Sequence, residues 1–435
     1  MILTRNTRLG AAALGFAVIL SACSSVLGFD SLTLLPGEGG VPTGEGGAQD
    51  GPTTGEGGPG DGGGTDAEPT CVGVDLTMDK KNCGRCNHDC LGGECAAGVC
   101  KPILLADGIA DAEGLVVDDL NVYVAENYLD RIAKFGKLAP STCMTPPLPP
   151  TCLYTATNVY RPTGMGIDGT NVYWVNSLSA SEIRSCSVKS CAGKTPNLVA
   201  ATAANAFDHV LGNGVLPLEL IVRDGQVFWP ESGGGAIRSA PVGGGTITTY
   251  LTNSSFAPLA IAVDDDSIYF TDDTNQHQTQ IASVPRAGAP GAIKIVSQSP
   301  ARPYGIALNG VTGNLYWTVP FVDEDVNGLI DTVPKTQNGG PPGTALAKGI
   351  LDDPRAIMTD GINVYWTVTG VGNAATGSVR YCPVKGCPGD GPIVIASAQK
   401  VPRHLTQDAT AIYWSNEGLS SSATFSGQVY KVAKP

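Results

Sequence analysis

The sequence predicts an all-β fold: a β-propeller of seven four-stranded blades, closed by a strand from the N-terminal side and preceded by a small disulfide-rich module. Three observations support this prediction. A pattern of short apolar strands recurs seven times after residue 101, the last copy lacks its final strand, and an additional strand precedes the first copy. Repeats of this length with almost no helical periodicity are typical of propeller blades.

The N-terminal residues have the features of an export signal. Arg5 and Arg8 form a basic start, and the apolar run from Leu9 to Leu20 is too short to span a bilayer comfortably. We therefore expect a signal peptide over residues 1–22 instead of a transmembrane helix.

The Leu-Ser-Ala-Cys sequence that ends at Cys23 resembles the lipobox of bacterial lipoproteins. The resemblance implies cleavage before Cys23, a diacylglycerol thioether on its sulfur and an acyl chain on its nitrogen. Because each buried CH₂ contributes about 0.8 kcal/mol, several chains anchor a protein stably to a membrane. Ser24 in place of Asp implies the outer membrane, on its periplasmic or its surface face. The alternative is an ordinary signal peptide with an incidental cysteine.

The composition predicts a tether behind the lipid and excludes one class of partner. Residues 36–69 are rich in Gly, Pro and acidic residues and contain almost nothing apolar, so we expect segment 23–70 to be a disordered spacer. The formal net charge of −13 and a pI near 4.7 argue against nucleic acid, whose binders cluster Lys and Arg. We expect a monomer.

The cysteine count agrees with export. Of 13 cysteines one is assigned to the lipid, which leaves an even number for disulfides in an oxidising compartment. Six lie in a module over residues 71–100, namely Cys71, Cys83, Cys86, Cys90, Cys95 and Cys100. The other six form three local pairs, Cys143 with Cys152, Cys186 with Cys191, and Cys382 with Cys387. The last two pairs flank short turns, where facing residues have the separation that a disulfide needs.

Two points about the module stay open. Six cysteines allow fifteen pairings, which sequence alone does not distinguish. Zinc is the alternative to disulfides, because Cys83 and Cys86 have ligand-like spacing with His88 nearby. Export to an oxidising compartment favours disulfides.

The repeat occupies residues 101–435. Each copy has an apolar strand, a polar turn and a second strand with one or two aromatics, as in GMGIDGTNVYW. The leading aromatics, spaced 41 to 55 residues apart, are Tyr123, Tyr173, Phe228, Tyr269, Tyr316, Tyr365 and Tyr413. Two more strands complete most copies, but the seventh ends after its third. We expect the orphan strand Pro102–Asp107 to complete that blade and close the ring, which removes open sheet edges.

The second strands also resemble a known family. Tyr-Phe-Thr-Asp at 269–272, Tyr-Trp-Thr-Val at 316 and 365, and Tyr-Trp-Ser-Asn at 413 resemble the YWTD repeats of low-density-lipoprotein-receptor-type propellers. That family usually has six blades. The order of lipobox, low-complexity tether, Cys-rich segment and propeller is similar to exported lipoproteins of myxobacteria and their relatives.

The regular residues of the repeat have structural explanations. The aromatics recur in every copy, which indicates packing between sheets instead of a ladder for stacking a ligand. Asp118, Asp168, Asp264, Asp360 and Asp408 begin tight turns, where Asp accepts backbone hydrogen bonds.

The nine-residue stretch DEDVNGLID, residues 323–331, is a candidate metal site. It resembles the Asp-x-Asp-x-Asn/Asp-Gly-x-x-Asp loops on hairpins of integrin-type propellers. In a tightly wound loop every second side chain points inward, and such an alternation of oxygen ligands suits calcium. The ligands of this structural calcium ion would be Asp323, Asp325, Asn327, the Leu329 carbonyl and Asp331. The alternative is an acidic turn before the next strand.

The function predicted first is a binding scaffold for an unknown protein or glycan ligand, tethered to the membrane. It rests on the anchor, the spacer and the absence from the sequence of an assembled GxSxG, HExxH or phosphate-loop motif. The polar residues expected near the axis are Glu113, Arg355, Arg403 and His404, as a pocket for an anionic or zwitterionic ligand.

The alternative function is a lactonase or hydrolase with its site at the axis. Glu113 followed by Gly114 resembles the first metal ligand of six-bladed gluconolactonase-type propellers. The corresponding positions of other copies include Arg355 and Arg403, which do not complete a metal cage. Two or more convergent carboxylates at the axis would favour this alternative, and a single one would exclude it.

Overall fold

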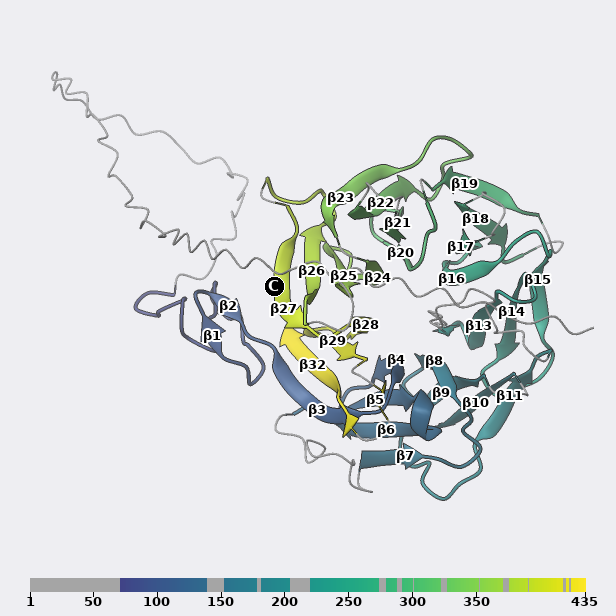
Figure 1. Cartoon of the computed structure of the whole chain (residues 1–435), viewed down its shortest axis with the longest axis horizontal. Coiled ribbons are helices and arrows are strands. Elements are labelled where there is room, and N and C mark those ends of the chain that lie inside the picture. The colour runs from purple at the N-terminus through teal and green to yellow at the C-terminus, as the bar shows by residue number, and fades with distance from the viewer. Residues whose placement is uncertain are drawn as a thin grey trace, which may run out of the picture. The chain divides into compact units, whose positions relative to one another are not determined.

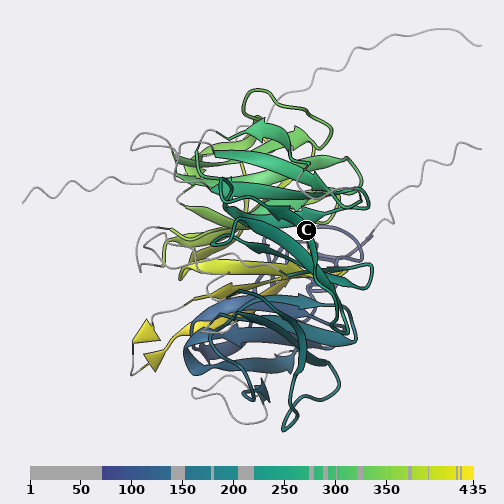
Figure 2. The same ribbon diagram turned by 90° about the vertical axis from the view of Figure 1, so that its right-hand side faces the viewer.

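The structure, a computed structural model, describes the Cys-rich module and the repeat region. The described residues are 71–138, 152–177, 181–203, 220–273, 279–287, 292–299, 301–321, 327–351, 353–370, 375–389, 391–417, 420–421 and 424–435. They form seven four-stranded antiparallel sheets, arranged as the blades of a ring as predicted (Figure 1). Figure 2 shows the ring from the side. Within these residues the structure has no helix long and apolar enough to cross a membrane.

In each of the first six blades the innermost strand comes first along the chain. Blade 1 contains β4 (Ala112–Val117), β5 (Asn121–Glu126), β6 (Arg131–Gly136) and β7 (Leu153–Thr155). Blade 2 contains β8 (Pro162–Ile167), β9 (Asn171–Asn176), β10 (Glu182–Ser187) and β11 (Asn197–Ala201). Blade 3 contains β12 (Ile221–Arg223), β13 (Gln226–Glu231), β14 (Ala236–Pro241) and β15 (Thr248–Thr252). Blade 4 contains β16 (Pro258–Val263), β17 (Ser267–Asp273), β18 (Thr279–Pro285) and β19 (Lys294–Gln298). Blade 5 contains β20 (Ile306–Leu308), β21 (Asn314–Phe321), β22 (Asn327–Pro334) and β23 (Thr344–Leu351). Blade 6 contains β24 (Pro354–Thr359), β25 (Asn363–Val368), β26 (Gly377–Pro383) and β27 (Ile393–Gln399).

Blade 7 joins the two ends of the described chain (Figure 1). From the C-terminal side come β28 (Pro402–Gln407), β29 (Ala411–Asn416) and β32 (Gly427–Ala433), and from the N-terminal side comes β3 (Ile103–Ile109). β3 pairs with β32 and is the closing strand that the sequence predicts. Two additions are a small hairpin of β30 (Ser420–Ser421) and β31 (Thr424–Phe425), and a 3-10 turn η1 (Asn127–Leu129) after β5.

The recurring aromatics pack between blades, as predicted. Trp366 of blade 6, for example, lies in one apolar cluster with Tyr316 of blade 5. The fully buried tryptophans are Trp174, Trp229, Trp317, Trp366 and Trp414. The recurring aromatics are therefore core residues.

Each turn aspartate fixes both its own turn and the aromatic that follows. Asp360 accepts hydrogen bonds from the amides of Ile362 and Asn363 at 2.9 and 2.7 Å. Its second oxygen accepts a hydrogen bond from the hydroxyl of Tyr365 at 2.8 Å. The same pairing joins Asp118 to Tyr123, Asp168 to Tyr173, Asp264 to Tyr269, and Asp408 to Tyr413. The predicted turn role is thus confirmed, and the tyrosine bond extends it.

A basic residue from the following blade pairs with several of these turns. Nζ of Lys335 in blade 5 lies 2.6 Å from Asp264 in blade 4. The other pairs are Arg286 with Asp224, Lys434 with Asp360, and Lys137 with Asp408. In blade 5 the turn carries Asn309 in place of Asp, and its side-chain amide donates a hydrogen bond to the Gly361 carbonyl of blade 6 at 3.1 Å.

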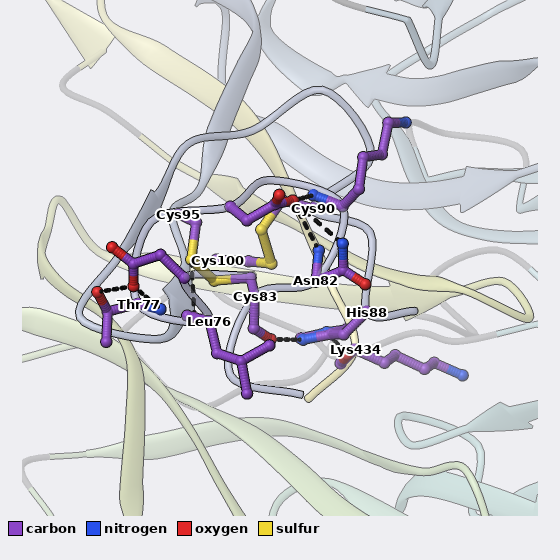
Figure 3. Close-up of a disulfide and its surroundings, with 12 residues drawn as sticks. Leu76, Thr77, Asn82, Cys83, His88, Cys90, Cys95, Cys100 and Lys434 are labelled. Atoms are coloured by element: carbon purple, nitrogen blue, oxygen red, sulfur yellow. Dashed lines mark hydrogen bonds between the residues drawn. A yellow bond between two sulfur atoms is a disulfide. The ribbon is translucent and has the colours of Figure 1, made fainter. Parts of the chain in front are cut away.

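The Cys-rich module packs against the end of blade 7 (Figure 3). Its disulfides are Cys71–Cys86, Cys83–Cys95 and Cys90–Cys100, around the ribbon of β1 (Cys95–Ala96) and β2 (Val99–Cys100). The ring of His88 bridges two carbonyl oxygens, with Nδ1 2.5 Å from Cys83 and Nε2 2.8 Å from Lys434. Because both cysteines of the zinc-like pair are in disulfides, neither offers zinc a thiolate.

Two local disulfides also lie in the blades, Cys186–Cys191 at the end of β10 and Cys382–Cys387 at the end of β26. Cys152 is disulfide-bonded as well. Its predicted partner Cys143 lies outside the described residues, as does Cys23.

Candidate functional site

The axis of the propeller is lined by the innermost strands, from β4 round to β28 (Figure 1). We call the end at which these strands begin the entry end, and the end at which they finish the exit end. Near the entry end, alignment of the copies places one residue at the start of each innermost strand at an equivalent position. In the described residues these are Glu113, Thr163, Leu259, Tyr304, Arg355 and Arg403. Leu218, expected in blade 3, lies outside the described residues.

Three carboxylates meet at the entry end. Asp111 and Glu113 come from the start of blade 1, and Glu417 follows β29 in blade 7. One oxygen of each lies within 4.8 Å of the others. We call these three residues the axial cluster. Glu417 forms an ion pair with the guanidinium of Arg403, so the cluster carries more negative than positive charge.

Burial and the excess negative charge raise pKa values in the axial cluster. Burial, followed by the negative charges of Glu113 and Glu417, raises the pKa of Asp111 to about 6. Burial also raises the pKa of Glu417, although Arg403 opposes it. Glu113 is itself only 6% exposed.

A partly buried imidazole faces the axial cluster. Nε2 of His404 lies 3.7 Å from Oε2 of Glu113, and it has no hydrogen-bond partner in the described part of the chain. His404 pairs with Ser415 across β28 and β29, so their side chains share one face of blade 7. The hydroxyl of Ser415 is fully buried and also lacks a partner. Two unsatisfied polar groups therefore stand beside the cluster, where buried polar atoms are normally bonded.

A positive side adjoins the axial cluster in blades 5 and 6. The guanidinium of Arg355 lies 4.5 Å from the ring centre of Tyr304 and 2.6 Å from the carboxylate of Asp353. Burial raises the pKa of Tyr304 to about 12, although the charges of Arg355 and Arg403 oppose the rise. Both arginines therefore reach Tyr304 electrostatically, and each already has a carboxylate partner.

Two cavities lie along the axis. One of about 270 Å³ is lined by His404 and by residues of β4 and β8, beside the cluster. A larger one of about 690 Å³ opens at the exit end and includes Arg223, Asp264 and Lys335. In the larger cavity Lys335 pairs with Asp264, and Arg223 pairs with Asp265. The smaller cavity is lined by His404, whose Nε2 has no hydrogen-bond partner in the described residues.

The structure brings the four predicted pocket residues to the entry end: His404 lies 3.7 Å from Glu113, Arg403 pairs with Glu417, and Arg355 lies in blade 6, next to the blade of Arg403. It adds Asp111, Glu417, Tyr304 and Asp353, which the sequence analysis did not single out. Glu417 occupies a position that recurs after the second strand. Its backbone amide donates a hydrogen bond to the carbonyl of the residue before the innermost strand of its blade, and the amides of Asn127, Ser177 and Thr369 do the same in other blades. Glu417 is the charged member of that series.

The candidate calcium loop is only partly described. Asp323 and Asp325 lie outside the described residues, and Asn327 begins β22. Leu329 and Asp331 lie within that strand, opposite Val319 and Trp317 of β21. Asp331 is 2% exposed, and burial raises its pKa to about 7.

Comparisons with known proteins show the fold. A catalytically inactive variant of virginiamycin B lyase from Staphylococcus aureus, solved with quinupristin, is 15% identical with a TM-score of 0.53, over 77% of this chain and 99% of that one. The selenomethionine-substituted lyase is 16% identical with a TM-score of 0.50, over the same shares, 77% and 99%. A nidogen/laminin complex is 17% identical with a TM-score of 0.41, over 59% of this chain and 87% of that one. No family model and no curated protein matches the sequence.

Proposed function

We propose that this chain is an exported, lipid-anchored β-propeller of the YWTD type that binds its ligand at the entry end of the axis. The ligand includes a divalent cation held by Asp111, Glu113 and Glu417. The convergence of these three carboxylates is the observation that carries the proposal. Hard divalent cations take carboxylate oxygens as ligands, and a bound cation would remove the repulsion within the cluster.

Two further observations favour a ligand over a merely acidic surface. Glu113 is buried, whereas solvated acidic groups need no cation. The unsatisfied Nε2 of His404 faces Glu113, and a set of carboxylate oxygens with an imidazole nitrogen suits Mn²⁺ better than Mg²⁺ or Ca²⁺, which take oxygen ligands.

Isothermal titration calorimetry with Ca²⁺, Mg²⁺ and Mn²⁺ tests the site. The variant Asp111→Asn/Glu113→Gln removes two charges and keeps the side-chain shapes. We expect it to bind one ion fewer per chain than the wild type. A cluster variant that binds as many ions as the wild type would contradict the proposal.

The loop at residues 323–331 is proposed as a second, structural calcium site. The variant Asp323→Ala/Asp325→Ala is then the matched control, because it should lose a calcium ion and keep the ion of the axial cluster. Calcium should also raise the thermal midpoint of the wild type more than that of the loop variant. Equal shifts in the two proteins would make the loop an acidic turn.

The proposed address and partner follow from the sequence. A lipid on Cys23 would hold the propeller at the outer membrane, from which a tether presents it to a protein or glycan. We expect Cys23→Ser to move the protein from the membrane fraction to the soluble fraction. Retention in the membrane fraction would argue against the lipid anchor.

A hydrolase is the second candidate function, and a specific observation favours it. The axial cluster supplies more than the two convergent carboxylates that the lactonase alternative requires. If the site hydrolyses lactones, δ-gluconolactone or a γ-lactone should be opened by the cation-loaded protein and not by Glu113→Gln. Equal rates for the two proteins would leave binding as the function.

A further inference from the structure

A threonine on the second strand bridges successive blades near the entry end. Thr318 in blade 5 accepts a hydrogen bond from the amide of Gly305 in its own blade at 2.9 Å. It donates one to the carbonyl of Arg355 in blade 6 at 2.8 Å. Thr271 and Thr367 make the same two contacts in blades 4 and 6. Three consecutive junctions, from blade 4 to blade 7, are therefore bridged by a hydroxyl.

We call the junction between blade 7 and blade 1 the seam. It has a hydroxyl at the equivalent position, but this hydroxyl does not make the bridging hydrogen bond. The equivalent residue is Ser415, whose buried hydroxyl has no partner within the described residues. By the pattern of the other blades, its acceptor would be the carbonyl of Glu113. Serine lacks the methyl group that helps to fix the rotamer of threonine in a strand. Blades 1, 2 and 3 carry Ala125, Val175 and Pro230 at this position, so these junctions lack the hydroxyl bridge.

The exit end and the middle of the seam are held by attractive contacts, whereas at the entry end carboxylates of the two blades face each other. At the exit end Lys137 of blade 1 lies 2.7 Å from Asp408 of blade 7. Between the ends, residues of β4, β5 and β29 share one apolar cluster. At the entry end Asp111 and Glu113 of blade 1 face Glu417 of blade 7, and like charges repel strongly where water is excluded.

We infer that a divalent cation in the axial cluster latches blade 7 to blade 1, in place of the hydroxyl bridge that joins blades 4 to 7. This inference rests on the proposed function, because it needs the cation site. The ion would bind carboxylates from both blades and turn a repulsive contact into a cross-link. Ligand binding at the axis and closure of the ring are then linked at one junction.

Hydrogen exchange of the full protein, with and without the cation that calorimetry identifies, tests the latch. Linkage requires that a cation at ten times its Kd lower the opening of the seam about tenfold. We expect that slowing in the amides of β4 and β28. The amides of β20 and β24, at the bridged junction of blades 5 and 6, should change little.

The outcomes separate the two proposals. If calorimetry shows no ion at the cluster, the proposed function and the latch both fail. If the ion binds but β4 and β28 exchange as before, or if every junction slows equally, the latch alone is overturned.

Two matched variants sharpen the result. Ser415→Thr places the bridging residue of blades 4 to 6 at the seam, so the seam should exchange more slowly without cation, and the cation should slow it further by the same factor as in the wild type. Thr318→Ser weakens a bridged junction, which should exchange faster with or without cation. A seam that is unaffected by Ser415→Thr, or a cation response in the Thr318→Ser junction, would contradict the inference.

Discussion

At the exit end of the axis, Asp408 has three kinds of partner, namely its own turn, Tyr413 and Lys137. At the entry end, Asp111 has two carboxylates beside it. The exit-end arrangement recurs from blade to blade, whereas the axial cluster is made of residues that depart from the repeat. The comparison teaches that in this propeller the repeated polar residues stabilise the ring, and the exceptions to the repeat form the candidate site.

We expect the largest loss of stability from a substitution that breaks the hydrogen bonds and the ion pair of Asp408 at the exit end. Asp408→Ala removes the turn hydrogen bonds, the tyrosine bond and the ion pair, and leaves Lys137 buried without its partner. We expect a loss of about 3 kcal/mol in the free energy of unfolding, measured by denaturant titration. A loss below about 0.5 kcal/mol, typical of surface substitutions, would show that the network is not structural.

The stability of the protein in acid should also depend on Asp408. Burial alone would raise the pKa of Asp408, but hydrogen bonds from Lys137, the Thr410 amide and Tyr413 outweigh it and hold the pKa well below its ordinary value. Because the folded-state pKa is depressed, this carboxylate stabilises the protein above its unfolded pKa of about 3.9 and loses that effect as the pH falls. Asp408→Asn should therefore flatten the fall in stability between about pH 5 and pH 2. An unchanged slope in acid would contradict the assignment.

We expect a smaller loss of stability from removing a tyrosine hydroxyl, and two tyrosines at equivalent positions isolate the contribution of its bond to aspartate. Tyr365 donates to Asp360 at 2.8 Å, whereas the hydroxyl of Tyr316 has only a 3.5 Å contact with the Val384 carbonyl. Tyr365→Phe should cost about 1 kcal/mol and Tyr316→Phe less than half of that. Equal losses in denaturant titrations would mean that the aspartate bond adds nothing.

The smallest effect removes one partly exposed exit-end ion pair. Asp224→Asn takes away the carboxylate that lies 2.9 Å from the guanidinium of Arg286, and Asn tolerates the left-handed φ of 52° at this position. An exposed ion pair contributes about 0.2–1 kcal/mol, so we expect a slight loss of stability in denaturant titrations, which becomes smaller as salt is added. A loss that persists in 1 M salt would point to another cause.

The fold was largely predictable from the sequence because propeller blades are local. Each hairpin places its apolar and turn residues close together along the chain, so the seven copies and the closing strand Pro102–Asp107 were readable. The Asp–Tyr bond was also visible as a five-residue spacing, as in Asp360 and Tyr365, although its geometry was not inferred. The module was different, because its three pairings depend on a compact packing that cysteine spacing does not determine.

The candidate site was predictable only in part. Glu113, Arg355 and Arg403 occupy equivalent positions, so alignment of the copies placed them near the axis. Glu417 and Asp111 lie outside that register, and they approach Glu113 only because closure of the ring brings blade 7 against blade 1. No local pattern encodes that contact, since its two sides lie at opposite ends of the repeat region.

The most direct test compares Asp111→Asn with Asp408→Asn in denaturant titrations, with and without the divalent cation that binds the wild type. Asp111 has a left-handed backbone, with φ of 57°, which Asn tolerates well. We predict that Asp408→Asn loses stability under both conditions. Asp111→Asn should be at least as stable as the wild type without cation, and it should lose most of the stabilisation that the cation provides. If Asp111→Asn is destabilised as much as Asp408→Asn, or keeps the full cation response, the entry end is one more structural part of the repeat and the axial cluster is not the site.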